Sequence, residues 1–84
     1  MKTAREMFEE LGYTFHEDLG FDELEFRKDV EPEIIISFDL SNKTVAVYDW
    51  GDYIDGFGTY YMSMQELQAI NQMCKELGWI EYEE

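Results

Sequence analysis

Residues 33–50 read E-I-I-I-S-F-D-L-S-N-K-T-V-A-V-Y-D-W, and this stretch decides the fold. Two runs, 33–40 and 43–50, are rich in β-branched and aromatic residues, and Ser41 and Asn42 lie between them. Such a pattern predicts a β-hairpin. Asparagine tolerates a positive φ better than most residues, so we expect Asn42 to form the turn.

A hairpin loop of two or four residues sorts these side chains onto two faces, because neighbouring residues of a strand point to opposite sides. One face is apolar and predicts the core beneath the helices: Ile34, Ile36, Phe38, Leu40, Val45 and Val47. The other face is mixed, suited to the surface or to contact with a partner: Ile35, Ser37, Asp39, Thr44, Ala46 and Tyr48.

Two amphipathic helices flank the hairpin. Thr3 and Glu6, and again Ser63 and Glu66, have the spacing of a capping box. A glycine then follows each apolar pattern and can close the helix in the left-handed conformation: Gly12 and Gly78. The second helix has an apolar stripe that predicts its buried face: Met64, Leu67, Ile70, Cys74 and Leu77.

Two further strands are expected. Leu24, Phe26 and Val30 alternate with polar residues, which indicates a half-buried strand, and residues 59–62 read as a short one. Residues 51–58 contain three glycines and read as a loop. The predicted fold is therefore α+β in one domain, residues 1–84: an N-terminal helix, a three- to four-stranded antiparallel sheet and a C-terminal helix, with both helices on one face of the sheet.

The charge limits the partners. The chain has 20 acidic against 6 basic residues, a formal net charge of −14 on 84 residues. Phosphates would be repelled, so direct binding to nucleic acid or to an anionic membrane is not expected, whereas a basic protein would be attracted. Hydrophobic residues make up 45% of the chain and aromatic ones 17%, which separates it from a disordered acidic tail.

Nothing in the sequence predicts catalysis or a cofactor. A Cys–His dyad would need His16 beside Cys74, the one cysteine, whose place on the apolar stripe is typical of a buried thiol. We therefore expect a non-enzymatic protein without an internal disulfide. The N-terminus has no apolar signal segment and no apolar run reaches the ~18 residues of a membrane span, so we expect a cytoplasmic protein.

Two segments are candidates for binding a partner. In residues 17–33, a row of carboxylates could imitate nucleic-acid phosphates: Asp22, Glu23, Glu25 and Asp29. In the segment after the hairpin, acids alternate with aromatic residues that suit a protein interface: Asp49, Trp50, Asp52, Tyr53, Asp55 and Phe57. The alternatives are a solvated acidic surface and aromatic rings buried in the core. The three aspartates of the second segment do not have the spacing of an EF-hand, so we predict no metal site.

Three pieces of the chain resemble small uncharacterised proteins encoded in phages and prophages of Gram-positive bacteria. These are A-R-E-M-F-E-E-L-G-Y (4–13), I-I-I-S-F-D-L-S-N-K-T-V (34–45) and M-S-M-Q-E-L-Q-A-I-N-Q-M-C-K-E-L-G-W (62–79). The resemblance implies a bacterial or phage cytoplasm and favours a regulator or inhibitor that binds host machinery. It supplies no catalytic residues.

Together these features predict a small acidic protein that binds a basic host or phage protein, with nucleic-acid mimicry as the sharper version. The alternative is a structural protein that assembles with copies of itself, in the simplest case a homodimer.

Overall fold

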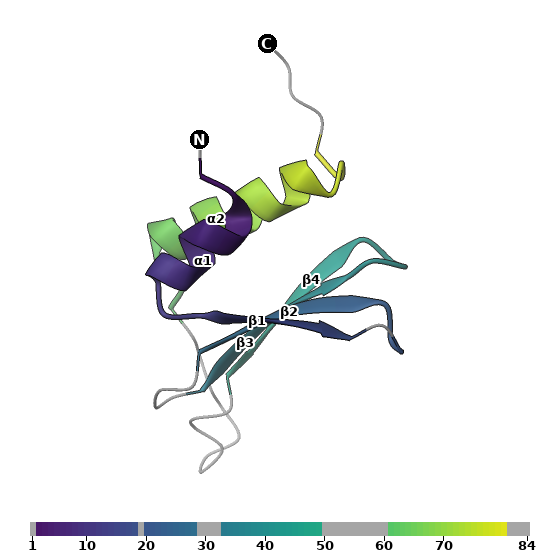
Figure 1. Cartoon of the computed structure of the whole chain (residues 1–84), viewed down its shortest axis with the longest axis horizontal. Helices are drawn as coiled ribbons and strands as arrows, with labels where there is room; N and C mark the ends of the chain where they lie inside the picture. The colour runs from purple at the N-terminus through teal and green to yellow at the C-terminus, as the bar shows by residue number, and fades with distance from the viewer. Residues whose placement is uncertain (1, 19, 29–32, 50–60, 81–84) are drawn as a thin grey trace.

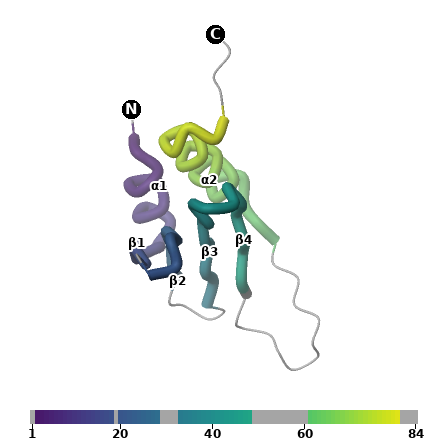
Figure 2. The backbone as a smooth tube through the Cα atoms, turned by 90° about the vertical axis from the view of Figure 1, so that its right-hand side faces the viewer, coloured from purple at the N-terminus to yellow at the C-terminus, as the bar shows by residue number. Residues whose placement is uncertain are grey.

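The computed structural model describes residues 2–18, 20–28, 33–49 and 61–80. Two helices and four strands follow one another along the chain: α1 (Ala4–Glu10), β1 (Thr14–Asp18), β2 (Glu23–Lys28), β3 (Ile34–Asp39), β4 (Thr44–Asp49) and α2 (Met64–Glu76). The strands form one antiparallel sheet in the order β1-β2-β3-β4. Both helices lie side by side over one face of it (Figures 1 and 2), so the predicted α+β fold is confirmed.

The helix ends are formed as the sequence predicts. The Thr3 hydroxyl accepts a hydrogen bond from the Glu6 amide at 3.2 Å, the Ser63 hydroxyl accepts one from the Glu66 amide at 3.1 Å, and both capping boxes are complete. Gly12 and Gly78 have φ values of 93° and 77°. These left-handed glycines let the next amide reach back to the last helical turn, from Tyr13 to the Phe8 carbonyl and from Trp79 to the Cys74 carbonyl.

The hairpin has the predicted register. Asp39 pairs with Thr44 and Ile36 with Val47, which leaves a turn of four residues, 40–43. The left-handed residue of this turn is Lys43, with φ 56°, and not Asn42 as expected. Asn42 acts through its side chain instead, because its amide nitrogen donates to the Asp39 carboxylate at 2.9 Å.

The fourth strand is not the one that the sequence predicted. β1 was not expected, because T-F-H-E-D has one large apolar residue and no run of β-formers. Conversely, Tyr61 and Met62 lie outside any strand and lead directly into the Ser63 cap. Thr59, Tyr60 and Val30 lie outside the described residues.

The core lies between the helices and the inner face of the sheet. Its centre is aromatic: Phe8 of α1 stacks on Phe26 of β2, with ring centroids 4.0 Å apart. Around this pair lie the fully buried side chains of Tyr13, Ile34, Ile36 and Phe38, together with Ala69 and Cys74 of α2. Burial raises the pKa of the Cys74 thiol.

Two expectations about the core are wrong. Val45 and Val47 of β4 are 36% and 38% exposed, because β4 is an edge strand and contributes nothing to the buried cluster of the described residues. In α2, Met64 and Leu67 are exposed, and Glu66 is buried in their place. In this rotation of the helix, the Tyr13 hydroxyl donates a hydrogen bond to the Glu66 carboxylate inside the protein.

Candidate partner-binding surface

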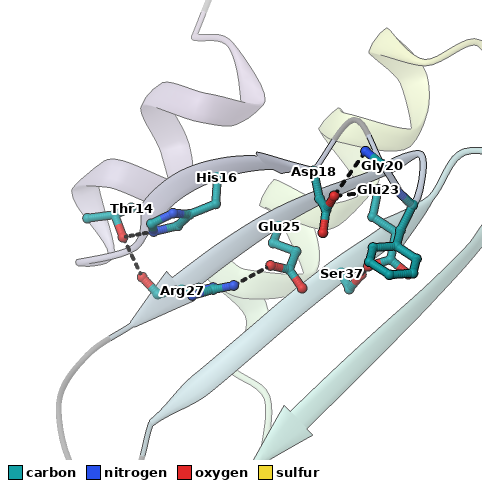
Figure 3. Close-up of polar contacts among 9 residues, drawn as sticks. Thr14, His16, Asp18, Gly20, Glu23, Glu25, Arg27 and Ser37 are labelled. Carbon is teal, nitrogen blue, oxygen red and sulfur yellow. Dashed lines mark hydrogen bonds and ion pairs between the residues drawn. The ribbon is translucent and has the colours of Figure 1, made fainter.

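The face of the sheet opposite the helices is here called the outer face, and Figure 3 shows polar contacts among side chains that lie on it or in the adjoining turn. Strand alternation assigns three residues of each strand to it: Thr14, His16 and Asp18 of β1, Glu23, Glu25 and Arg27 of β2, Ile35, Ser37 and Asp39 of β3, and Thr44, Ala46 and Tyr48 of β4.

Three carboxylates form a row at one end of this face. Asp18 pairs with Glu23 across β1 and β2, and Glu23 pairs with Asp39 across β2 and β3. Directly opposite residues of an antiparallel pair have Cβ atoms about 4.5–5.5 Å apart. We call Asp18, Glu23 and Asp39 the acidic row. Like charges at this distance repel, so the row itself opposes folding.

Backbone hydrogen bonds orient the two outer carboxylates of the row. An Asp18 oxygen accepts from the amides of Gly20 and Phe21 at 3.1 and 3.3 Å. An Asp39 oxygen accepts from the amides of Asn42 and Ser41 at 3.0 and 2.9 Å. The hydrogen bonds from Asn42, and then the one from Ser41, hold the pKa of Asp39 below its usual value, so the carboxylate stays charged.

The two turns beside the row are joined to each other. The Ser41 hydroxyl donates to the Asp22 carboxylate at 2.9 Å, and the Leu40 amide donates to the Asp22 carbonyl at 3.0 Å. Asp22 has φ 57°, a conformation that aspartate tolerates in turns. The acidic row and Asp22, together the acidic end, are thus four carboxylates on a hydrogen-bonded frame. Among the described residues of the two turns at this end, 20–22 and 40–43, Lys43 is the one with a basic side chain.

Further along the outer face the charges are paired. Arg27 contacts Glu25 at 2.7 Å, and the Glu25 side chain is only 16% exposed. Ile35 and Ser37 are 9% and 4% exposed. They were expected at the surface, but β3 is a central strand with a neighbouring strand on each side, and both side chains are buried. The Ser37 hydroxyl makes a long contact, 3.5 Å, with Glu23.

The predicted binding residues do not form one patch. Asp22 and Glu23 belong to the acidic end, whereas Glu25 is committed to Arg27. Asp49 is at the opposite end of the sheet, since it pairs with Ile34. The others lie outside the described residues: Asp29, Trp50, Asp52, Tyr53, Asp55 and Phe57.

The sequence interpretation missed Asp18 and Asp39 as site residues. Asp39 was assigned to the correct face, but its neighbours could not be known without β1 and the pairing of β2 with β3. The signal that could have found them is register: once β1 is paired with β2 and β2 with β3, the antiparallel alignment places Asp18, Glu23 and Asp39 opposite one another.

The structure does not bring His16 and Cys74 together. His16 lies on the outer face, with its Nε2 3.1 Å from the Thr14 hydroxyl, and Cys74 lies in the core on the other side of the sheet. Within the described ranges, no group of three or more His, Cys, Asp or Glu side chains could hold a metal ion. No helix in the described part of the chain is both long and apolar enough to cross a membrane.

A pocket of about 180 Å³ is lined by residues of α1 and α2 and their flanks. Its lining residues are Lys2, Met7, Glu10, Leu11, Gln65 and Gln68, and Lys2 forms an ion pair with Glu10 at 2.6 Å. Neither its size nor its lining points to a ligand.

No family model, curated protein or solved structure matches this chain.

Proposed function

We propose that the protein is a small, non-enzymatic binding protein that holds a basic protein against its acidic end. The observation that carries the proposal is the acidic row. Charges that serve only solubility can be spread over a surface, whereas these three lie directly opposite one another at a cost in stability.

The fixed orientation of these carboxylates supports the same proposal. Asp18 and Asp39 are held by backbone amides, and Asp22 joins the two turns, so little side-chain freedom is lost when a basic group is bound. The net charge of −14 should also speed the association of a basic partner, because complementary charge mainly raises the association rate.

Nucleic-acid mimicry is the sharper form of this proposal. Adjacent strands are about 4.8 Å apart, so the acidic row presents charges at intervals of the same order as the ~3.4 Å rise between phosphates of one duplex strand. A protein whose basic groove binds a duplex would then bind the acidic end in its place. The resemblance to phage-encoded proteins favours a host or phage protein as this partner, in a cytoplasm.

The proposal can be tested by capture on the immobilised protein from a lysate of a Gram-positive bacterium, with elution by a salt gradient. We expect a basic protein that is released as salt rises, because exposed charges are screened within about 10 Å at 0.1 M salt. Mimicry further predicts that duplex DNA releases the same protein at constant salt. Retention of neutral or acidic proteins only, or of proteins that resist high salt, would contradict the proposal.

A further inference from the structure

Phe21 is an aromatic residue exposed to solvent at the acidic end. It lies in the turn between β1 and β2 and is 77% exposed. Single exposed hydrophobic residues are common on protein surfaces and by themselves indicate no function. Phe21 differs in its neighbours, because Asp22 follows it directly and its own amide donates a hydrogen bond to the Asp18 carboxylate at 3.3 Å.

The backbone on both sides of Phe21 is held in place. The hydrogen bond to Asp18 holds the residue itself. The next residue, Asp22, is joined to the neighbouring turn, because its carboxylate accepts from the Ser41 hydroxyl at 2.9 Å and its carbonyl from the Leu40 amide at 3.0 Å. The aromatic ring is therefore attached to a fixed backbone, and little conformational entropy is lost when a partner covers it.

The two aspartates beside Phe21 each have an available oxygen. Within the described residues, Oδ1 of Asp18 accepts from the amides of Gly20 and Phe21, and Oδ2 of Asp22 accepts from the Ser41 hydroxyl. The second oxygen of each carboxylate accepts no hydrogen bond from these residues. An apolar group that covers Phe21 would take both charges out of water without pairing them, which is costly. A positively charged group suits this position.

The chain does not supply such a group in the part that the structure describes. Two other rings do have a cation over them. The Arg5 guanidinium lies 4.8 Å from the ring centroid of Phe15, and the Lys28 ammonium lies 5.6 Å from that of Tyr13. Phe21 has no such contact with a described residue, so a cation over its ring would come from another molecule.

We infer that this cation is an arginine of the partner, whose guanidinium stacks on Phe21 and donates hydrogen bonds to the carboxylates beside it. The inference rests on the proposed function and names the side chain that the acidic end prefers. A guanidinium is planar, is weakly hydrated, stacks on aromatic rings and presents two N–H groups to one carboxylate. A lysine ammonium has the same charge but is compact and strongly hydrated, so it gains less from the ring.

Two peptides of equal charge test the preference, one with four Gly-Arg repeats and one with four Gly-Lys repeats. Fluorescence anisotropy measures the affinity of each labelled peptide for the whole chain at fixed low salt. We expect the wild type to bind the arginine peptide more tightly. Phe21→Leu removes the ring and keeps an apolar side chain, so it should weaken the arginine peptide by about threefold and change the lysine peptide little.

Two control variants accompany this measurement. Phe21→Tyr keeps the ring and should keep the preference for arginine. Tyr61→Leu removes a ring that is 85% exposed outside the acidic end, and it should leave the binding of both peptides unchanged. The arginine assignment is overturned if Phe21→Leu affects the two peptides equally, or if Tyr61→Leu has the same effect as Phe21→Leu.

The variant Asp22→Asn/Glu23→Gln distinguishes a failure of this inference from a failure of the proposed function. It should weaken both peptides, because it removes two negative charges from the acidic end. If it does so while Phe21→Leu has no selective effect, the arginine inference fails and the proposed function holds. If it weakens neither peptide, the acidic end is not the binding surface and both proposals fail.

Discussion

Glu23 is the middle carboxylate of the acidic row, with Asp18 on one side and Asp39 on the other. The carboxylates of Asp18 and Asp39 accept hydrogen bonds from backbone amides of the turns. The Glu23 carboxylate, in the described structure, has only the long contact with the Ser37 hydroxyl. The negative charge of Glu23 therefore repels both neighbouring carboxylates, and this one long contact does little to offset that cost.

Replacing Glu23 by glutamine should stabilise the protein. Removing one charge relieves two cross-strand repulsions, each worth about 0.2–1 kcal/mol, so we expect the free energy of unfolding to rise by about 0.4–2 kcal/mol. Urea unfolding at low salt measures it, with Glu9→Gln on the exposed side of α1 as the control of equal charge. If Glu23→Gln lowers the urea midpoint, the row is not under repulsion and the argument for its function is lost.

Tyr13 and Glu66 form the polar contact that the sequence did not reveal. Both side chains are buried, at 2% and 4% exposure, and the tyrosine hydroxyl donates to the carboxylate. Glu66 also completes the capping box of α2, with an oxygen 2.9 Å from the Ser63 amide. One carboxylate thus fixes both the start of α2 and its rotation against the sheet.

Tyr13→Phe removes the hydroxyl donor and leaves the ring in the core. A hydrogen bond to a charged group contributes about 1.5–3 kcal/mol, so we expect the free energy of unfolding to fall by that amount. Thermal or urea unfolding measures the loss, and Tyr48→Phe, at an exposed position, should leave stability unchanged. A Tyr13→Phe variant as stable as the wild type would show that this contact does not orient α2.

At the scale of elements, the structure is most predictable where the determinants are local. The caps at Thr3 and Ser63, the glycines that end both helices and the register of residues 34–49 all follow from residues a few positions apart. β1 could not be predicted, because its pairing with β2 and the contact of Phe15 with Phe26 come from the tertiary structure. The inward rotation of Glu66 has the same origin.

The N-terminal cap predicts a pH dependence. Hydrogen bonds from the Thr3 amide and hydroxyl lower the pKa of Glu6 from its ordinary 4.5. A lowered folded-state pKa contributes stability that is present above pH 4.5 and is lost as the pH falls through the folded-state value. Glu6→Gln should therefore be less stable than the wild type at pH 7, and the difference should shrink below pH 4.5. A difference that is constant from pH 7 to pH 3 would contradict the charged cap.

At the scale of the molecule, the net charge and the positions of the acidic residues have different effects on binding. Any partner of basic character is attracted by a net charge of −14, whatever surface it finally contacts. The sequence shows the total charge and the acidic stretch with Asp22 and Glu23, but the acidic row depends on which strands lie side by side. The site was therefore partly predictable: Asp18, Asp22 and Glu23 all come from the acidic segment 17–33, of which the sequence interpretation named Asp22 and Glu23, and Asp39 is brought to them by the sheet.

The central claim is that the acidic end binds the partner, and charge-matched variants test it most directly. Asp22→Asn/Glu23→Gln and Glu9→Gln/Glu33→Gln each remove two negative charges, from −14 to −12, the first pair at the acidic end and the second at exposed positions elsewhere. The affinity and association rate of each variant for the captured basic protein would be measured at fixed salt. We expect the first to lose about tenfold in affinity, equivalent to about 1.4 kcal/mol, and the second to differ little from the wild type. Equal losses in the two variants would contradict the claim, because the net charge alone would then explain the binding.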